Sequence, residues 1–206
     1  MIQAKRELLN LLPIQDGDLM IRQLARSDID HYAQWPQYPP EYDAFNETFS
    51  LRLASMTSEQ RDERFRTWTQ DDERIALAID LGQEPAIANL MLRQIDWQAH
   101  VVRNMGYLVK PTHVSQGIGT RILRTTADWC FEHGIHGLRL DVVACNTRAV
   151  RCYEKVGFTI TGEFWKDEEP LRGKDLSLPE LQFMHPHVRL SGEVPQIRFW
   201  WMEMNR

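Results

Sequence analysis

The run from Tyr107 to Arg121, YLVKPTHVSQGIGTR, constrains the fold more than any other part of the chain. A strand-like segment over 101–109 ends at a Lys–Pro pair, and Gly117 and Gly119 then open a segment of helical periodicity. Glycines allow backbone N–H groups to approach a ligand, and a helix N-terminus adds unpaired N–H groups and a positive dipole end. The junction therefore suits a pyrophosphate, although the same join also occurs as an ordinary tight turn.

The remaining periodicity alternates between helical and strand-like segments, which predicts a mixed α/β fold. Strands are predicted over 18–24, 75–80, 86–95, 101–109, 138–143, 158–165 and 195–202. Helices are predicted over 57–70 and 118–133, and also after the capping residues Ser27 and Asn146. We expect one domain over 1–206, with an N-terminal extension over 1–16 and a long loop over 166–195.

Composition and charge exclude several kinds of protein. Hydrophobic residues make up 43% of the chain and charged residues 26%, which is ordinary for a folded globular protein. The net charge is −5 and no Lys/Arg run is present, which argues against nucleic-acid binding. No apolar run approaches 18 residues, so we expect no membrane span. The three cysteines form no CxxC pair, so we expect a reduced, cytoplasmic protein without a disulfide framework.

A second run, DVVACNTRAVRCYEKVGF over 141–158, is more specific. Together with the glycine pair it resembles the GNAT superfamily of acyl-CoA-dependent N-acetyltransferases, and the resemblance covers about 101–165. It implies the GNAT fold, a central, mostly antiparallel sheet of six to seven strands flanked by about four helices. Within the family the chain is most similar to the RimJ/RimL-like branch, whose members acetylate protein α-amino groups or small amines.

The resemblance implies acetyl-CoA as a co-substrate, bound through the glycine loop and the strand that precedes it. Asn146 would contact the pantetheine arm and also cap its helix. The implied binding residues are Leu108, Val109, Val114, Ser115, Gln116, Gly117, Ile118, Gly119, Thr120, Asn146 and Tyr153. Val114 departs from the family, because the loop usually begins there with Arg or Gln.

Two residues are the candidate catalytic groups. Tyr153 matches the family position that protonates the leaving thiolate, although it also fits a core tyrosine with a satisfied hydroxyl. Asp141 is a candidate base acting through water, and the alternative is a strand carboxylate paired with Arg139, Arg148 or Arg151. Asn104 stands where relatives often carry Glu, and an amide cannot be a base. Glu163, a water chain and bulk solvent are the other sources of a base.

The acceptor amine is expected beside two loops, which cover 35–50 and 166–195. Trp35, Tyr38 and Trp165 are the predicted acceptor contacts, although the Pro- and aromatic-rich loop over 35–45 would also fit a loop that buries its own rings. The acceptor itself is expected to be a protein N-terminus or a small molecule. The alternative to an enzyme is a non-catalytic acyl-CoA-binding or sensor module of the same fold.

Two further expectations concern metals and partners. His185 and His187 lack Cys or carboxylate partners at metal-ligand spacing, so we expect a solvated loop and no metal. The resemblance also implies a homodimer, because many relatives dimerise, and the aromatic residues Phe199, Trp200 and Trp201 are compatible with one. A single alternating strand would equally bury one set of these side chains and leave the other for a neighbouring element.

Overall fold

All strands of the computed structural model, which describes residues 2–38, 49–168, 171 and 179–206, lie in one nine-stranded sheet. The order across it is β1-β2-β3-β4-β5-β6-β9-β7, and β8 pairs with β9. Every pairing is antiparallel except the one between β5 and β6. The strands are β1 Ile14–Asp16, β2 Leu19–Gln23, β3 Ile75–Leu81, β4 Glu84–Asp96, β5 Val101–Val109, β6 Gly137–Val143, β7 Thr159–Asp167, β8 Val188–Ser191 and β9 Val194–Asn205. The predicted mixed α/β, mostly antiparallel fold is confirmed, and the sheet is larger than expected.

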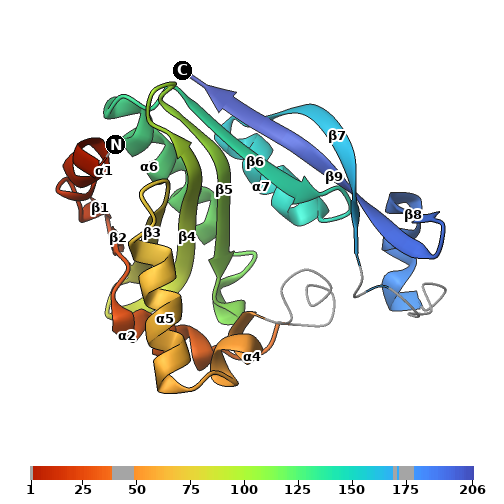
Figure 1. The fold of residues 1–206 in the computed structure, drawn as a ribbon, viewed down its shortest axis with the longest axis horizontal. Coiled ribbons are helices and arrows are strands. Elements are labelled where there is room, and N and C mark those ends of the chain that lie inside the picture. Colours follow the sequence, from red (N-terminus) through yellow and green to blue (C-terminus); the bar gives the residue numbers. More distant parts are fainter. Residues whose placement is uncertain (1, 39–48, 169–170, 172–178) are drawn as a thin grey trace.

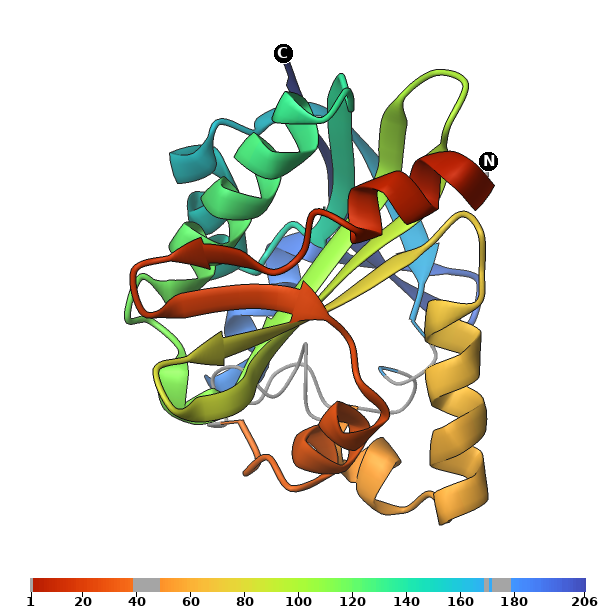
Figure 2. The same ribbon diagram turned by 90° about the vertical axis from the view of Figure 1, so that its left-hand side faces the viewer.

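Helices cover both faces of the sheet (Figures 1 and 2). One face packs against α6 and α7, and the other packs against α2, α4 and α5 around a second, smaller core. The helices of the described residues are α1 Ile2–Leu9, α2 Arg26–Ala33, α4 Phe49–Ala54, α5 Ser58–Thr69, α6 Ile118–Glu132 and α7 Thr147–Val156, with 3₁₀ turns η1 Pro111–His113 and η3 Pro179–His187.

The central strand β4 explains how the two cores are separated. Its residues 86–92 are all buried, as expected for a strand covered on both sides. Leu90 and Leu92 point to the α6 core, whereas Met91 between them points to the core beneath α2 and α5. The run ends at Arg93, which is exposed and lies on the same face as Met91.

Two predicted segments contain regular structure, and one predicted helix cap needs correction. The segment 1–16 contains α1 and β1, and Lys5 ties α1 to the fold by donating its Nζ to the carbonyls of Thr69 (2.8 Å) and Asp71 (2.7 Å). The predicted long loop over 166–195 contains η3 and β8. The capping role of Ser27 is wrong, because Ala25 precedes α2 and the carboxylate of Asp28 accepts the Ala25 N–H. Residues 39–48, most of the predicted aromatic loop, lie outside the described residues.

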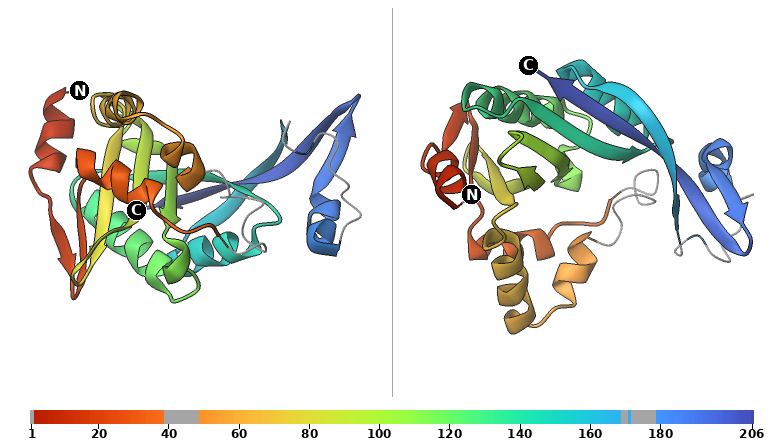
Figure 3. Two further views of the ribbon diagram at one scale, coloured as in Figure 1. Left: turned by 90° about the horizontal axis from the view of Figure 1, so that it is seen from below. Right: turned by 45° about the horizontal axis from the view of Figure 1, so that its top comes forward.

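The parallel pair β5 and β6 opens a wedge in the middle of the sheet. These strands pair only at their first residues, Val101 with Gly137 and Val102 with Leu138. Beyond this point β5 stays paired with β4 and β6 stays paired with β9, so the sheet divides into two halves (Figure 3). The backbone groups along the inner edge of each half are therefore available to a ligand.

Candidate functional site

A cleft of about 1130 Å³ occupies the wedge between the two halves of the sheet. Its walls come from β4 and β5 on one side and from β6, β9 and α7 on the other, with the glycine loop at one end and α5 at the other. Most of the predicted co-substrate residues line it, namely Leu108, Val109, Val114, Ser115, Gly117, Gly119, Thr120, Asn146 and Tyr153.

Gly117 and Gly119 are each favoured at their positions for a different structural reason. Gly117 precedes α6 with a φ of +79°, a left-handed conformation that favours glycine. Gly119 lies in the first turn of α6, where an added β-carbon would come within 3.0 Å of the Tyr107 hydroxyl. Together they let the N-terminus of a 15-residue helix face the cleft, with its unpaired N–H groups and positive dipole end.

Two residues of the predicted loop do not line the cleft. Gln116 instead donates its side-chain amide to the Thr112 carbonyl at 2.8 Å and so stabilises the loop. Ile118 packs into the α6 core with 9% of its surface exposed. The structure therefore places them as supports of the loop.

Replacing Gly119 with Ala tests whether the loop needs this close approach. The added methyl group should displace Tyr107 or the first turn of α6, since overpacking of this kind costs about 1–3 kcal/mol. We expect weaker acetyl-CoA binding, measured by calorimetric titration, with little change in the rate at saturating co-substrate. Unchanged affinity would contradict a role for this turn.

Tyr153 reaches the cleft from α7. Its ring packs edge-on against Tyr107 and Phe158 and only 6% of the residue is exposed, yet its hydroxyl has no hydrogen-bond partner among the described residues. Burial, followed by the nearby Cys152 and Asp141, raises the pKa of Tyr153 well above its ordinary value. The hydroxyl is therefore protonated at neutral pH, which is the form that donates a proton.

Asp141 lies on β6, on the opposite face of the sheet from α7. Asn104 donates its side-chain amide to the Asp141 carboxylate at 2.7 Å, across the point where β5 and β6 separate. Of the alternative partners, Arg139 pairs with Glu203 at 3.2 Å instead. Asn104 therefore orients Asp141 in the cleft without neutralising its charge.

The predicted acceptor contacts separate into two groups. Tyr38 lines the cleft and donates its hydroxyl to the Val109 carbonyl at 2.6 Å. Trp35 is 6% exposed, packs against Tyr32 in the second core and donates its indole N–H to the Ala86 carbonyl. Arg189 lies over the ring of Trp165, with its guanidinium carbon 4.3 Å from the ring centre. The structure brings neither tryptophan to the cleft, because each has a packing partner elsewhere.

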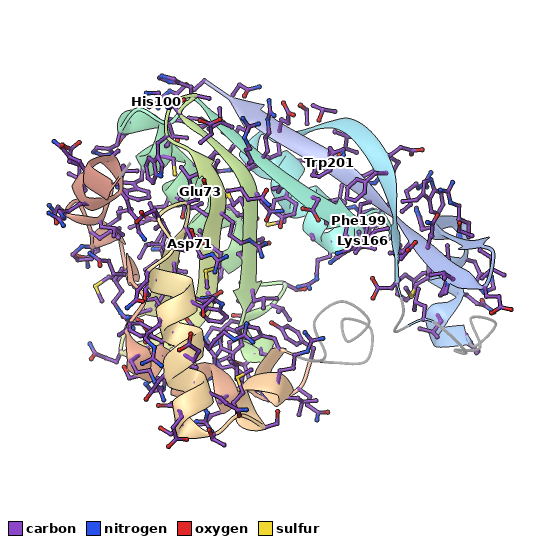
Figure 4. The ribbon with its side chains drawn as sticks, in the orientation of Figure 1. Asp71, Glu73, His100, Lys166, Phe199 and Trp201 are labelled. Carbon is purple, nitrogen blue, oxygen red and sulfur yellow. The ribbon has the colours of Figure 1, made fainter. Side chains whose placement is uncertain are left out.

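Sequence reasoning missed a group of aromatic and cationic side chains that also line the cleft. They are Phe49, Arg64, Trp68, Arg74, Arg93, Lys166 and Phe199. The one sequence signal was the charge of Arg93, which interrupts the apolar run of β4. Figure 4 shows Trp201, Phe199 and Lys166 following one another along β9 and β7 on the far side of the wedge.

The chemistry of the cleft fits acetyl-CoA. Backbone donors of the loop suit the pyrophosphate, and Arg148, Arg151 and Lys155 bring cationic side chains to the cleft from α7. Asn146 lines the cleft and caps α7, because its side-chain oxygen accepts the Ala149 N–H at 3.2 Å. The cap uses this oxygen, so it is the side-chain NH₂ group that stays available for the implied contact with the pantetheine arm. Leu108 and Val109 line the cleft at the end of β5, where the carbonyl of Val109 accepts the Tyr38 hydroxyl.

The described residues show neither a cluster of metal ligands nor a membrane-spanning helix. Among the described residues, no three His, Cys, Asp or Glu side chains gather closely enough to hold a metal ion. His187 instead contacts Arg198, with 2.9 Å between Nδ1 and Nη2. No helix in the described ranges has the length and apolar character needed to cross a membrane.

Comparisons with known proteins agree with this geometry. A family model described as the acetyltransferase (GNAT) family matches residues 31–158. No curated protein sequence matches the chain significantly. Similar solved structures include spermidine N-acetyltransferase from Vibrio cholerae in complex with CoA and spermine, at 15% identity and a TM-score of 0.66 over 92% of this chain and 96% of that chain. An acetyltransferase of the GNAT family from Streptococcus pneumoniae matches at 20% identity and a TM-score of 0.56, over 91% and 99%. At these identities the likeness shows the fold alone.

Proposed function

Because the chain belongs to the GNAT acetyltransferase family, we propose that it transfers the acetyl group of acetyl-CoA directly to a primary amine. The acceptor is an amine of a small molecule or a protein N-terminus. The observation that carries this proposal is the wedge between β5 and β6, which brings the α6 N-terminus, Tyr153 and Asp141 to one cleft.

Acetyl-CoA, when bound, supplies a thioester whose carbonyl carbon the amine attacks. The glycine loop and α7 hold the phosphates, and the free edge of β5 positions the arm by backbone hydrogen bonds. Tyr153 donates its proton to the sulfur as the carbon–sulfur bond breaks. Holding both reactants in the same cleft converts a bimolecular reaction into one that behaves as unimolecular.

Asp141 is proposed to remove the proton of the acceptor ammonium group, directly or through water. It lies on β6, on the opposite face of the sheet from Tyr153, and Asn104 donates a hydrogen bond to its carboxylate. The base then acts on the acceptor and the acid on the thioester. Asp141 takes the first proton of the ammonium group before attack, and Tyr153 protonates the departing sulfur. The second proton of the nitrogen leaves as the amide forms and restores the Tyr153 hydroxyl through solvent.

A thiol-release assay with acetyl-CoA tests the proposed function. The panel should contain amino acids, their amides, polyamines, aminoglycosides and short peptides with free N-termini. We expect release of free thiol with at least one class and a product heavier by one acetyl group in mass spectrometry. Tight binding of acetyl-CoA without transfer to any amine would instead favour the acyl-CoA-binding module.

Replacing Asp141 with Asn tests the base. General-base assistance contributes about 10²- to 10⁴-fold, so kcat/KM should fall by at least 10² at neutral pH. The deficit should shrink at higher pH, because an acceptor that is already deprotonated needs no base. A uniform deficit across pH would indicate that Asp141 only shapes the cleft.

Three finer assignments belong to the same proposal. Membership of the RimJ/RimL-like branch rests on the motif resemblance, and a cytoplasmic location rests on the cysteine pattern. A homodimer is supported by the exposed apolar side chains of Ile160 and Trp201, which are 44% and 40% exposed. The spermidine N-acetyltransferase of Vibrio cholerae has a dodecameric structure at 16% identity, so larger assemblies are known for this fold.

A further inference from the structure

Cationic side chains outnumber acidic side chains among the described residues that line the cleft. Among the described residues that line it, one is an acid, Asp141, and seven are Lys or Arg, namely Arg64, Arg74, Arg93, Arg148, Arg151, Lys155 and Lys166. The three on α7 lie on the face of the sheet that carries the α6 loop, where the proposed function places the phosphates of acetyl-CoA. The other four come from α5, β4, β7 and the residue before β3, and no phosphate of the co-substrate accounts for them.

Arg93 is the member of this group that is linked to the proposed base through its strand partner. Its strand partner across β4 and β5 is Asn104, which hydrogen-bonds to Asp141, so the three residues form one row across the sheet. Its guanidinium lies over Gly106, where an added β-carbon would come within 2.7 Å of Nη2. The missing side chain at Gly106 therefore gives the guanidinium room beside the cleft.

The charge of Arg93 is poorly compensated. No hydrogen bond or ion pair joins it to another residue in the described part of the chain, whereas Arg74 nearby has the same sign. Although Arg93 is exposed as a residue, partial desolvation of its guanidinium lowers its pKa, Asp141 raises the pKa and Arg74 lowers it further. An anion bound here would compensate this charge.

Arg74 and Arg64 extend the positive surface. Arg74 pairs with Asp71 at 3.3 Å and donates to the Thr67 carbonyl, but its Nε is buried without a partner among the described residues. Arg64 lies over the ring of Trp68, 5.9 Å from its centre. Asp71 and Glu73 sit on the turn between α5 and β3 and are not among the lining residues (Figure 4). The acidic residues near Arg64 and Arg74 therefore lie on the turn beside the cleft and do not line it.

We propose that the acceptor carries a carboxylate beside its reactive amine, and that Arg93 binds this carboxylate while Asp141 receives the amine. This inference rests on the proposed acetyl transfer. A guanidinium binds a carboxylate through two parallel N–H···O bonds, a geometry that an ammonium group cannot provide. Because Asn104 alone lies between Arg93 and Asp141, a compact molecule such as an amino acid can present its carboxylate to Arg93 and its amine to Asp141.

The same wall should reject polyamines. Spermidine brings several positive charges, and in the described cleft it would meet one carboxylate and four acceptor-side cations. Like charges placed together at an interface are costly, so a polyamine should be a poor acceptor. This chain would then differ in acceptor class from the spermidine N-acetyltransferases that share its fold.

Thiol release with matched acceptors tests the proposal. Amino acids and their amides share the amine and differ in the carboxylate, and comparing each variant with wild type removes the effect of different amine pKa values. In Arg93→Ala, KM for amino acids should rise about 10- to 100-fold, since a hydrogen bond to a charged group contributes about 1.5–3 kcal/mol. KM for the amides should stay within about twofold. Arg93→Lys should recover part of the loss, and Arg66→Ala, which lies outside the cleft on α5, should behave as wild type.

Three other results of this assay would lead to different conclusions. Equal losses for amino acids and amides would show that Arg93 only balances the charge of Asp141, and the proposal would be wrong. Preference for spermidine, or for an amine that carries a phosphate in place of a carboxylate, would also overturn it while leaving acetyl transfer intact. Failure of every amine to release thiol would instead contradict the proposed function itself.

Discussion

Replacing Tyr153 with Phe is expected to lower kcat by about 10²- to 10³-fold while leaving acetyl-CoA affinity within about twofold. The substitution removes only a hydroxyl that has no partner among the described residues, so the ring contacts with Tyr107 and Phe158 remain. The loss should therefore come from the proton that the leaving sulfur no longer receives. Steady-state kinetics and calorimetric titration with acetyl-CoA measure the two quantities separately.

Two controls make this expectation specific. Tyr32 is another buried tyrosine, whose hydroxyl donates to the Ala88 carbonyl at 3.1 Å, so Tyr32→Phe should cost about 1 kcal/mol of stability and leave kcat unchanged. A thioester donor with a more acidic thiol needs less help from an acid, so the Tyr153→Phe deficit should shrink with such a donor. An equal deficit with both donors would assign Tyr153 a packing role.

Replacing Arg22 with Met is expected to give the largest loss of stability, about 3–5 kcal/mol in the free energy of unfolding. Arg22 joins β2 to α2 and β3 by binding Asp28 at 2.7 Å and Asp80 at 2.7 Å. Asp28 and Asp80 are only 1% and 8% exposed, and both raise the pKa of the Arg22 guanidinium, Asp28 more strongly. Removing the cation leaves two buried carboxylates without a counter-charge. Urea denaturation followed by circular dichroism measures the loss.

The exposed pair of Arg66 and Glu63 on α5 supplies the control. Both side chains are more than half exposed, and surface pairs of this kind contribute about 0–1 kcal/mol. Arg66→Ala should therefore change the unfolding free energy by less than about 0.5 kcal/mol. If Arg22→Met were equally mild, the Arg22 pairs would not anchor the second core to the sheet.

Local elements were largely predictable from sequence. The helix over 57–70, the hairpin strands β3 and β4, and α6 after its glycines appear within a few residues of their predicted bounds. Asn146 caps α7 as predicted, and Gly157 ends it in the left-handed conformation. Each of these features depends on residues that are close in sequence, so the pattern of a short window is sufficient.

Errors occurred where distant segments compete for the same residue. Trp35 was predicted at the acceptor site because it lies in an aromatic loop, but Tyr32 and the Ala86 carbonyl give it partners in the core. The segment 188–191 falls within the predicted long loop over 166–195, whereas pairing with β9 makes it a strand. Neither outcome is visible in the local sequence, because the partner that decides it lies elsewhere in the chain.

By itself, the sequence determined the turn at Gly117, the Asn146 cap of α7 and the motif that identifies the family, since these depend on backbone conformations and hydrogen bonds within a few residues. Only the tertiary structure decided which side chains share the cleft. The register of β4 on β5 places Arg93 opposite Asn104, and the separation of β5 from β6 lets Asn104 reach Asp141. Strand register and strand separation are set by cores on both faces of the sheet, so no single window of sequence contains the arrangement of acid, base and cationic wall.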